Sequence, residues 1–330
     1  MRKVLVTGGS GFIGSALVKK LVKTGYSVRV LDDSSRGNAR RLREVENDIE
    51  FIQGDVRNAE VVDEATCGMD IVAHLAFVNG TEFFYSKPEL VLEVGVKGAI
   101  YTLDSAIRHG VPEYWLMSSS EVYQTPPHVP TDESVGFYVP DPLNPRYSYG
   151  GGKMISELMA LNYGIRHFEK VVVVRPHNVY GPDMGWEHVI PQFAVRAKDA
   201  VAQHPGEGAV PFPIQGDGSQ SRSFVYIDDF IEGCHLAYTK GQHRNIYHVG
   251  TSEEIRIGDL AREVMRYFGR QAKLIMETLP QGGTMRRCPD IAKISRLGYL
   301  PKFTLNTGLT MTTPSYVENR QLSPMPVATV

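Results

Sequence analysis

The sequence predicts an α/β protein built on a doubly wound parallel sheet, followed by a smaller C-terminal α/β domain. Short apolar stretches alternate with stretches of helical periodicity over the first half of the chain, and the first apolar stretch breaks into a run of glycines. The chain has 330 residues, of which 42% are apolar, enough for one large domain and one smaller one. We expect the first domain over residues 1–176, with a return of the chain to it at about 223–250, and the second mainly over 177–330.

The amino-acid composition indicates which kinds of binding partner and cellular location to expect for this chain. The 35 basic and 37 acidic residues nearly cancel, which favours neither nucleic acid nor an anionic membrane as a partner. No apolar run is long enough to span a membrane, and the apolar start of the chain ends at Gly8, too early for a signal peptide. Cys67, Cys234 and Cys288 are scattered and form no C-x-x-C motif, so we expect no disulfide, no metal site and a cytoplasmic location.

The first predicted strand, residues 3–7, runs through a glycine-rich turn into a helix that starts at Phe12. Glycines let a pyrophosphate approach the backbone, and a helix N-terminus offers free N–H groups and a positive dipole end. The turn fits G-x-G-x-x-G and also G-x-x-G-x-x-G, so both registers stay open. The first register uses Gly9, Gly11 and Gly14, the second uses Gly8, Gly11 and Gly14, and Phe12 and Ile13 open the helix in both.

Asp32 ends the next apolar run, at the distance along the chain where a carboxylate binds the adenosine ribose of a dinucleotide. The glycine turn and this acid together predict a Rossmann-type dinucleotide-binding domain. A carboxylate at this place repels a 2′-phosphate, which favours NAD over NADP. Arg36, four residues later, leaves NADP open.

Two further strands are predicted over residues 49–53 and 70–75. In doubly wound sheets, ligands bind beyond the carboxyl ends of the strands. We therefore expect Asp55 and Val56 after one strand, and Leu75, Ala76 and Phe77 after the other, to line the cofactor groove.

A helix over 90–109 leads to a strand over 114–118, which ends in three serines and a glutamate. Ser119, Ser120 and Glu121 stand where an α/β enzyme places its chemistry, or they form a polar loop that caps a helix. A long proline-rich loop follows over 124–146.

Tyr149 and Lys153 lie one turn apart on the helix predicted beyond that loop. A neighbouring ammonium favours the ionised form of a phenol, so we expect Lys153 to lower the pKa of Tyr149 and make it a base. The alternative is a helix-surface pair.

The ordered set of motifs resembles the extended short-chain dehydrogenase/reductase family, the NAD-dependent nucleotide-sugar epimerases and dehydratases. The matching segments are TGGSGFIGS (7–15), Asp32, GDV (54–56), HLA (74–76), SSSEVY (118–123), YGGGK (149–153), RPHNVYGP (175–182), IQGDGSQSRSFVYIDD (214–229) and RRCPDIAKISRLGYLP (286–301). The resemblance implies that Tyr149 takes a proton from a sugar hydroxyl, that Lys153 holds the nicotinamide ribose, and that Ser119 binds the same sugar oxygen.

The resemblance also implies a nucleotide-diphosphate sugar as substrate. Its binding residues would be Ser120, Asn178, Arg222, Arg287 and Asp290, with the two arginines on phosphate or ribose oxygens. Members of the family commonly form homodimers through two helices, here within 90–108 and 150–168. Within the smaller domain we expect a strand over 247–250 and a helix over 255–268, and a frayed tail over 322–330.

Three activities remain open, all through a 4-keto sugar. We expect first a 4-epimerase or related C4 oxidoreductase. A 4,6-dehydratase uses adjacent Asp and Glu, but Ser120 precedes Glu121 here, and Ser-Ser-Glu is closer to the Thr-Ser-Glu of UDP-glucuronate decarboxylases. Gln124 departs from the glycine that most members carry. An NAD-binding sensor without catalysis is the alternative of another class, which the presence of both Tyr149 and Lys153 disfavours.

Overall fold

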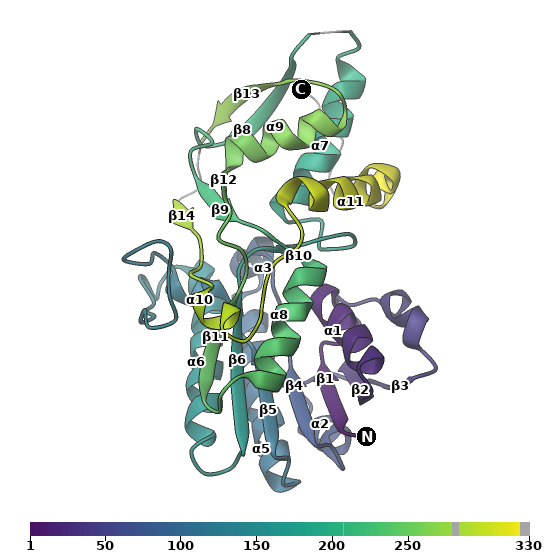
Figure 1. Cartoon of the computed structure of the whole chain (residues 1–330), viewed down its shortest axis with the longest axis vertical. Helices are drawn as coiled ribbons and strands as arrows, with labels where there is room; N and C mark the ends of the chain where they lie inside the picture. The colour runs from purple at the N-terminus through teal and green to yellow at the C-terminus, as the bar shows by residue number, and fades with distance from the viewer. Residues whose placement is uncertain (207, 279–283, 324–330) are drawn as a thin grey trace.

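The computed structural model describes residues 1–206, 208–278 and 284–323 (Figure 1). Its centre is a seven-stranded sheet in the order β11-β6-β5-β4-β1-β2-β3, and every neighbouring pair is parallel. The strands are β1 (Lys3–Thr7), β2 (Ser27–Asp32), β3 (Ile49–Gln53), β4 (Ile71–His74), β5 (Glu113–Met117), β6 (Lys170–Pro176) and β11 (Asn245–Val249). The predicted α/β fold with a doubly wound parallel sheet is confirmed.

Helices cover both faces of the sheet, because the side chains of its central strands are apolar on both faces and must be buried. Val4 and Val6 of β1 face one cluster of buried side chains, and Leu5 faces the other. Helices α1 (Phe12–Lys23) and α8 (Ile227–Lys240) contribute to the first cluster, and α2 (Ala59–Thr66), α5 (Gly98–Arg108) and α6 (Ser148–Tyr163) to the second. The sheet is thereby a rigid base whose strands end at one common edge.

The helix predicted over 90–109 is interrupted. It consists of α4 (Pro88–Leu92), a π-helical turn over Glu93–Lys97, and α5. Gly95 lies in this turn, directly against the ring of Phe77: a Cβ at residue 95 would stand 2.1 Å from Phe77 Cζ. Single π-helical turns are frequent at functional sites, and this one adjoins the cavity described below.

The smaller part of the molecule lies beyond the carboxyl ends of the sheet strands, at the top of Figure 1. It contains α7 (Val189–Gln203), α9 (Ile257–Tyr267) and α11 (Leu305–Glu318), with the parallel pair β8 (Val210–Gln215) and β13 (Ala272–Glu277). Shorter elements join the two parts: α3 (Thr81–Ser86), β7 (Val179–Tyr180), β9 (Ser221–Ser223), β10 (Val225–Tyr226), β12 (Glu254–Arg256), β14 (Arg286–Arg287), α10 (Ala292–Ser295) and 3-10 turns at Ala39–Val45, Ser120–Tyr123, Pro145–Tyr147 and Arg320–Leu322.

The strand expected over 247–250 in the smaller domain belongs instead to the main sheet, within the range 223–250 over which a return of the chain to the first domain was expected. It is β11, which pairs with β6 at the edge of the main sheet. Its apolar residues Tyr247 and Val249 are buried against the cluster that also holds α8, and this burial draws the strand into the large sheet. The division of the chain near residue 176 stays a prediction, and the tail expected over 322–330 lies mostly outside the described residues.

The sequence predicts no membrane-spanning segment, no disulfide and no metal site, and the described residues bear on each of these expectations. Within them, no helix combines the length and the apolar character that crossing a membrane requires. Cys67, Cys234 and Cys288 are unbridged, and the described part of the chain brings together no group of three or more potential metal ligands among His, Cys, Asp and Glu.

Candidate active site

A cavity of about 430 Å³ opens at the carboxyl ends of the sheet strands and continues toward the smaller part of the molecule. A volume of this order is typical of small-molecule sites. Most of the residues predicted for cofactor and catalysis line it: Gly8, Gly11, Phe12, Ile13, Gly14, Asp32, Asp55, Val56, Leu75, Ala76, Ser119, Ser120, Glu121, Tyr149 and Lys153. Asn178 and Arg287 line it from the substrate side.

The structure decides between the two glycine registers. Gly8 has φ +72°, and a Cβ there would stand 2.8 Å from the backbone of Ala76. A Cβ on Gly14 would stand 2.1 Å from the carbonyl oxygen of Gly8. Gly9 instead faces the Val30 side chain and does not line the cavity. The functional register is therefore G-x-x-G-x-x-G, with Gly8, Gly11 and Gly14.

The N-terminus of α1 faces this glycine turn without a side-chain cap, since its N-cap residue is Gly11. The first N–H groups of a helix have no partner within the helix, so they are available to an anionic group in the cavity. This is the arrangement that a pyrophosphate requires.

Asp32 stands at the end of β2, where its carboxylate accepts N–H groups from Ser10 at 2.9 Å and Ser34 at 2.8 Å. These bonds fix its orientation at the cavity wall. The arginines nearby are occupied: Arg36 pairs with Glu187, and Arg41 donates to Asp183 at 2.9 Å. This pairing leaves no free guanidinium among them for a 2′-phosphate and favours the dinucleotide without one.

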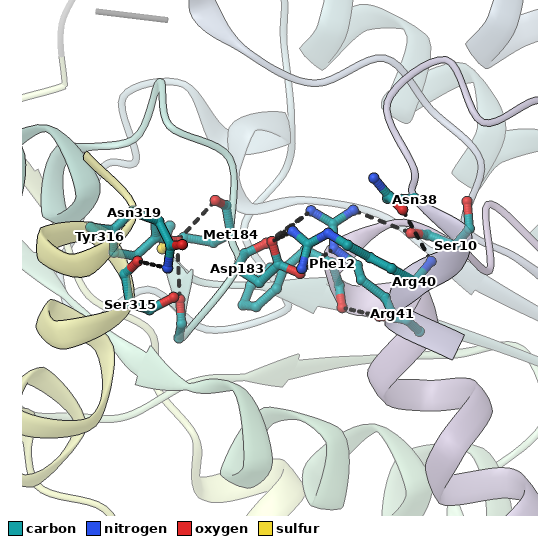
Figure 2. A network of polar contacts seen from close by, with 12 residues as sticks. Ser10, Phe12, Asn38, Arg40, Arg41, Asp183, Met184, Ser315, Tyr316 and Asn319 are labelled. Carbon is teal, nitrogen blue, oxygen red and sulfur yellow. Dashed lines mark hydrogen bonds and ion pairs between the residues drawn. The ribbon is translucent and has the colours of Figure 1, made fainter. Parts of the chain in front are cut away.

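Figure 2 shows Arg40 and Arg41 reaching from the 3-10 turn after β2 to Asp183, on the loop that leads into the smaller part. Arg41 also donates to the carbonyl oxygen of Ser10 at 3.2 Å, so it touches the glycine turn and the opposite loop at once. On the other side, Tyr316 of α11 donates to the carbonyl oxygen of Met184 at 2.9 Å. We call the contacts of Arg36, Arg40 and Arg41 with Asp183 and Glu187 the arginine clasp.

Tyr149 lies in the first turn of α6, buried between two rings. Phe84 stacks on it and Phe77 meets it edge to face, each at 5.0 Å between centroids. Burial raises the pKa of Tyr149 well above its ordinary value, and a hydrogen bond with the Ser119 side chain acts in the opposite direction. Ser119 therefore stands beside the phenol, as predicted for two groups that share one substrate oxygen.

Lys153 follows one turn later and does not lower the pKa of Tyr149 as expected. Its Nζ donates to the carbonyl oxygen of Met117 at 2.7 Å and lies 4.0 Å from the centroid of the Phe77 ring. Burial lowers the pKa of Lys153 to about 7, while the Glu157 carboxylate acts to raise it. The expectation fails because both groups are desolvated and the ammonium points to a backbone carbonyl.

Glu121 forms an ion pair across the cavity wall with Arg287 of β14, Nη1 to Oε1, at 2.5 Å. Arg287 also donates to Thr284 Oγ1 at 3.0 Å. Burial alone would raise the pKa of Glu121, but Arg287, Arg146 and Arg222 together outweigh it, so the pKa falls below its ordinary value. Glu121 is thus an ionised carboxylate in a group of three arginines.

The other predicted substrate residues differ in position. Ser120 is buried at the cavity wall, and Asn178 donates to the Ser223 carbonyl oxygen at 2.8 Å. Arg222 lies on strand β9, beside Arg287, and its guanidinium donates to the carbonyl oxygens of Ser221 and Thr284. Asp290 is not brought to the cavity: its carboxylate accepts the Ala292 N–H at 2.7 Å, next to the start of α10.

Several cavity residues escaped the sequence analysis. They are Val78, Gly80, Thr81, Phe84, Met184, Gly185, Glu187 and His188, together with Ser35 and Arg41. Most lie in irregular segments, where periodicity carries no information. Phe77, in contrast, lines the cavity as expected from its position directly after Leu75 and Ala76, at a strand end.

Comparison with known proteins agrees with this site. Residues 4–250 match the NAD-dependent epimerase/dehydratase family. The structure of a dTDP-glucose 4,6-dehydratase double mutant from Streptomyces venezuelae, with NAD bound, is 30% identical and superposes with a TM-score of 0.85, covering 97% of this chain and 98% of that one. A UDP-glucose 4-epimerase from Thermotoga maritima, solved with UDP-glucose, is 25% identical with a TM-score of 0.83, covering 96% and 99%. UDP-glucuronic acid decarboxylase 1 from Arabidopsis thaliana is 29% identical over 310 residues, 93% of this chain and 68% of that protein.

Proposed function

Because the chain belongs to the NAD-dependent epimerase/dehydratase family, it is an enzyme of that family, and we propose that it acts on a nucleotide-diphosphate hexuronate as a decarboxylase. The observation that carries this proposal is the pair of residues after Ser119. Ser120 offers no carboxylic acid, and Glu121 is held ionised by Arg287. Among the described residues, neither of these two therefore supplies an acidic proton to a departing C6 hydroxyl, while Tyr149 and Ser119 remain available for oxidation at C4.

NAD is the cofactor, and the cavity fits it. The close approach of Gly8 and Gly14 to neighbouring backbone, and the uncapped start of α1, suit its pyrophosphate. Asp32 suits the adenosine ribose, and Lys153 the nicotinamide ribose. When bound, NAD accepts a hydride from C4 of the sugar and later returns it.

Tyr149 and Ser119 both act on the oxygen at C4 of the sugar. Tyr149 acts in its ionised form: the phenolate accepts the C4 hydroxyl proton as the C4–H bond breaks, and the Ser119 hydroxyl donates a hydrogen bond to the same oxygen. Their neighbourhood supports these roles, since the Ser119 side chain is close enough to the phenol to act on the pKa of Tyr149. A positioned general base of this kind contributes about 10²–10⁴-fold to a rate.

Decarboxylation then needs little from the protein. The C5–C6 bond breaks, C6 leaves as carbon dioxide, and the electron pair moves through C5 to the C4 oxygen, which becomes an enolate. Hydrogen bonds from Tyr149 and Ser119 stabilise that oxygen, in the way an oxyanion hole does. Water then supplies a proton at C5, and the C4 ketone is reduced again by the hydride that C4 lost, while Tyr149 returns its proton to the C4 oxygen.

The arginine group supports an anionic substrate. Arg146, Arg222 and Arg287 surround one carboxylate, Glu121, which leaves two positive charges uncompensated among these four residues. Guanidinium groups bind phosphate and carboxylate oxygens in a fork, which suits a diphosphate. Asn178 lies on the same side of the cavity and is the proposed contact to the sugar diphosphate.

A 4,6-dehydratase is the second candidate, because the similarity to the Streptomyces venezuelae enzyme spans nearly the full length of both chains. The 4-epimerase that the sequence placed first is less well supported, since simple hydride return gives no role to the Glu121–Arg287 pair.

The product's mass separates the three reactions. The NAD-loaded protein is incubated with UDP-glucuronate, dTDP-glucose and UDP-glucose, and the products are analysed by mass spectrometry. The decarboxylase proposal expects loss of carbon dioxide from UDP-glucuronate. Loss of water from either glucose nucleotide supports the dehydratase, and an isomer of unchanged mass that chromatography separates from its substrate supports the epimerase.

Glu121→Gln tests the role of the ion pair. We expect it to lower turnover at least tenfold, because it removes the charge that holds Arg287 in place. Glu50→Gln is the matched control, since it breaks an ion pair with Arg29 on the outside of the sheet, away from the cavity. Full turnover by Glu121→Gln would favour the epimerase.

We also propose that the protein is a homodimer through α5 and α6. Three apolar side chains of the segment 155–165 are exposed in the single chain: Ile155 at 41%, Leu158 at 50% and Ile165 at 57%. Ile155 and Leu158 lie on α6 at a spacing of three, hence on one helix face. A second copy would cover that face.

A further inference from the structure

We propose that Phe77 is a positioning residue, whose ring holds the Lys153 ammonium and the Tyr149 phenol in their relative orientation. The proposal rests on the assignment of Tyr149 and Lys153 to the reaction made above. It adds a residue with no charge or hydrogen-bonding group, located in the irregular segment after β4.

The ring contacts both members of the pair. The Lys153 Nζ lies 4.0 Å from the ring centroid, within the range of a cation–π interaction, and much nearer than its 5.8 Å from the Tyr149 centroid. The edge-to-face contact with Tyr149 has a centroid separation of 5.0 Å, a preferred arrangement of aromatic pairs. Phe77 thus touches both side chains, while no direct bond joins them.

The surrounding backbone is shaped to admit this ring. A Cβ on Gly95 would stand 2.1 Å from Phe77 Cζ, and a Cβ on Gly152 would stand 2.9 Å from the same atom. Gly152 lies inside α6, where glycine is less favourable than alanine. Gly95 lies in the π-helical turn. Two glycines from separate segments therefore leave space for one aromatic ring beside the pair.

The Phe77 ring is also one of the groups in direct contact with the Lys153 ammonium. The titratable groups facing Lys153 are Tyr149 and Glu157 of its own helix and His74 of β4. Burial, with a further contribution from Lys153, lowers the pKa of His74 to about 3, so this histidine is neutral. Glu157 is bound to Arg175 by two hydrogen bonds, of 2.9 and 2.6 Å. Phe77 and the Met117 carbonyl are thus the groups that directly contact the charge.

The first test measures the protonation of Lys153 itself. In protein with ¹³C-labelled lysine, the titration of the Lys153 ε-carbon is followed by NMR in the NAD-loaded enzyme and identified by its loss in Lys153→Met. Phe77→Leu keeps an apolar side chain but removes the π face, so the midpoint should fall by about one pH unit. The alkaline limb of the kcat profile should move in the same direction, with kcat lowered at least tenfold and KM little changed.

The second test uses the glycines. Gly95→Ala should push the ring away and lower kcat about tenfold in the wild-type background, although alanine favours a helix. In a Phe77→Ala background, the same Gly95→Ala change should have no further effect. Gly151→Ala is the matched control on the helix of Tyr149 and Lys153, because the nearest atom to its new Cβ is Val139 Cγ2 at 3.9 Å.

The outcomes separate this proposal from the proposed function. An unchanged Lys153 titration and unchanged kcat in Phe77→Leu would overturn the role of Phe77, as would an equal loss from Gly95→Ala with and without Phe77. If the titration shifts but no nucleotide sugar is decarboxylated, Phe77 retains its role and the decarboxylase assignment fails.

Discussion

The Lys153 side chain is buried, and burial destabilises its charged form relative to its neutral form. Its ordinary pKa of 10.5 falls to about 7 in the folded protein, chiefly through burial. Between these two values the unfolded chain binds a proton that the folded chain has released. The free energy of unfolding should therefore rise with pH over this window, and below about pH 7 this contribution is constant and unfavourable.

Replacing the ammonium with a side chain of similar length should reveal this cost. We expect Lys153→Met to have a higher Tm than the wild type at pH 6 to 7, by an amount that shrinks steadily toward pH 10, as measured by calorimetry of the cofactor-free proteins. Lys19→Met, which removes a surface lysine paired with Glu44, should show no such pH dependence. A Tm difference that stays constant with pH would contradict the buried, low-pKa lysine.

At the scale of single residues, the sequence predicted which positions matter better than what each one contacts. Tyr149, Lys153 and Ser119 were placed correctly at the cavity because a strand end and a helical spacing are local properties. The ion pair of Glu121 with Arg287 joins residues 166 positions apart, and no local pattern reports such a contact. Asp290 shows the converse error, since its position next to a motif did not bring it to the cavity.

At the scale of elements, the arginine clasp connects the loop after β2 to the loop that enters the smaller part of the molecule (Figure 2). Asp183 is its centre, accepting hydrogen bonds from both Arg40 and Arg41. Both loops line the wall of the cavity where the adenosine end of the cofactor is expected. Bound dinucleotide would therefore leave more easily when the clasp is broken.

Asp183→Asn should accelerate NAD release about fivefold, the equivalent of ~1 kcal/mol for a partly exposed ion pair. Asparagine tolerates the positive φ of +66° at this position, so the backbone should keep its path. Release is followed by stopped-flow dilution of the loaded enzyme. The control is Asp63→Asn, which loses contacts to Arg108 and His109 outside the cavity. An unchanged release rate in Asp183→Asn would show that the clasp does not retain the cofactor.

The sequence predicted the helices and strands whose apolar residues are regularly spaced, but it did not predict where a helix is interrupted. The strands β1 to β6 and helices α1, α6 and α9 follow from apolar periodicity and from the glycines that separate them. The π-helical turn over Glu93–Lys97 was missed because the apolar spacing does not mark it; its Gly95 packs against the ring of Phe77, which lies outside the helix. The assignment of β11 to the wrong domain has the same origin, since a strand's sequence does not specify which sheet edge is open.

At the scale of the whole molecule, the cofactor residues lie at the ends of the sheet strands, and Arg222 and Arg287 lie on β9 and β14, which join the sheet to the smaller part, so the site forms between the two parts. The proposed homodimer would pack α6 against its copy, outside this cavity. Leu158→Arg places a charge in the middle of that face and should convert the dimer to a monomer, measured by light scattering after size-exclusion chromatography. Leu300→Arg, at another exposed leucine, should leave the dimer intact. A wild type that is monomeric at micromolar concentration would contradict the proposal.

The central claim is that Tyr149 removes the C4 hydroxyl proton while C4 loses its hydride. The most direct measurement compares wild type and Tyr149→Phe, both NAD-loaded, for the rate of hydride transfer from C4 of UDP-glucuronate, followed by the absorbance of the reduced nicotinamide in a single turnover. We expect the variant to bind the nucleotide sugar with similar affinity and to transfer hydride at least 100-fold more slowly, in line with the roughly 10²–10⁴-fold contribution of a general base. Hydride transfer within twofold of the wild-type rate in the variant would contradict it.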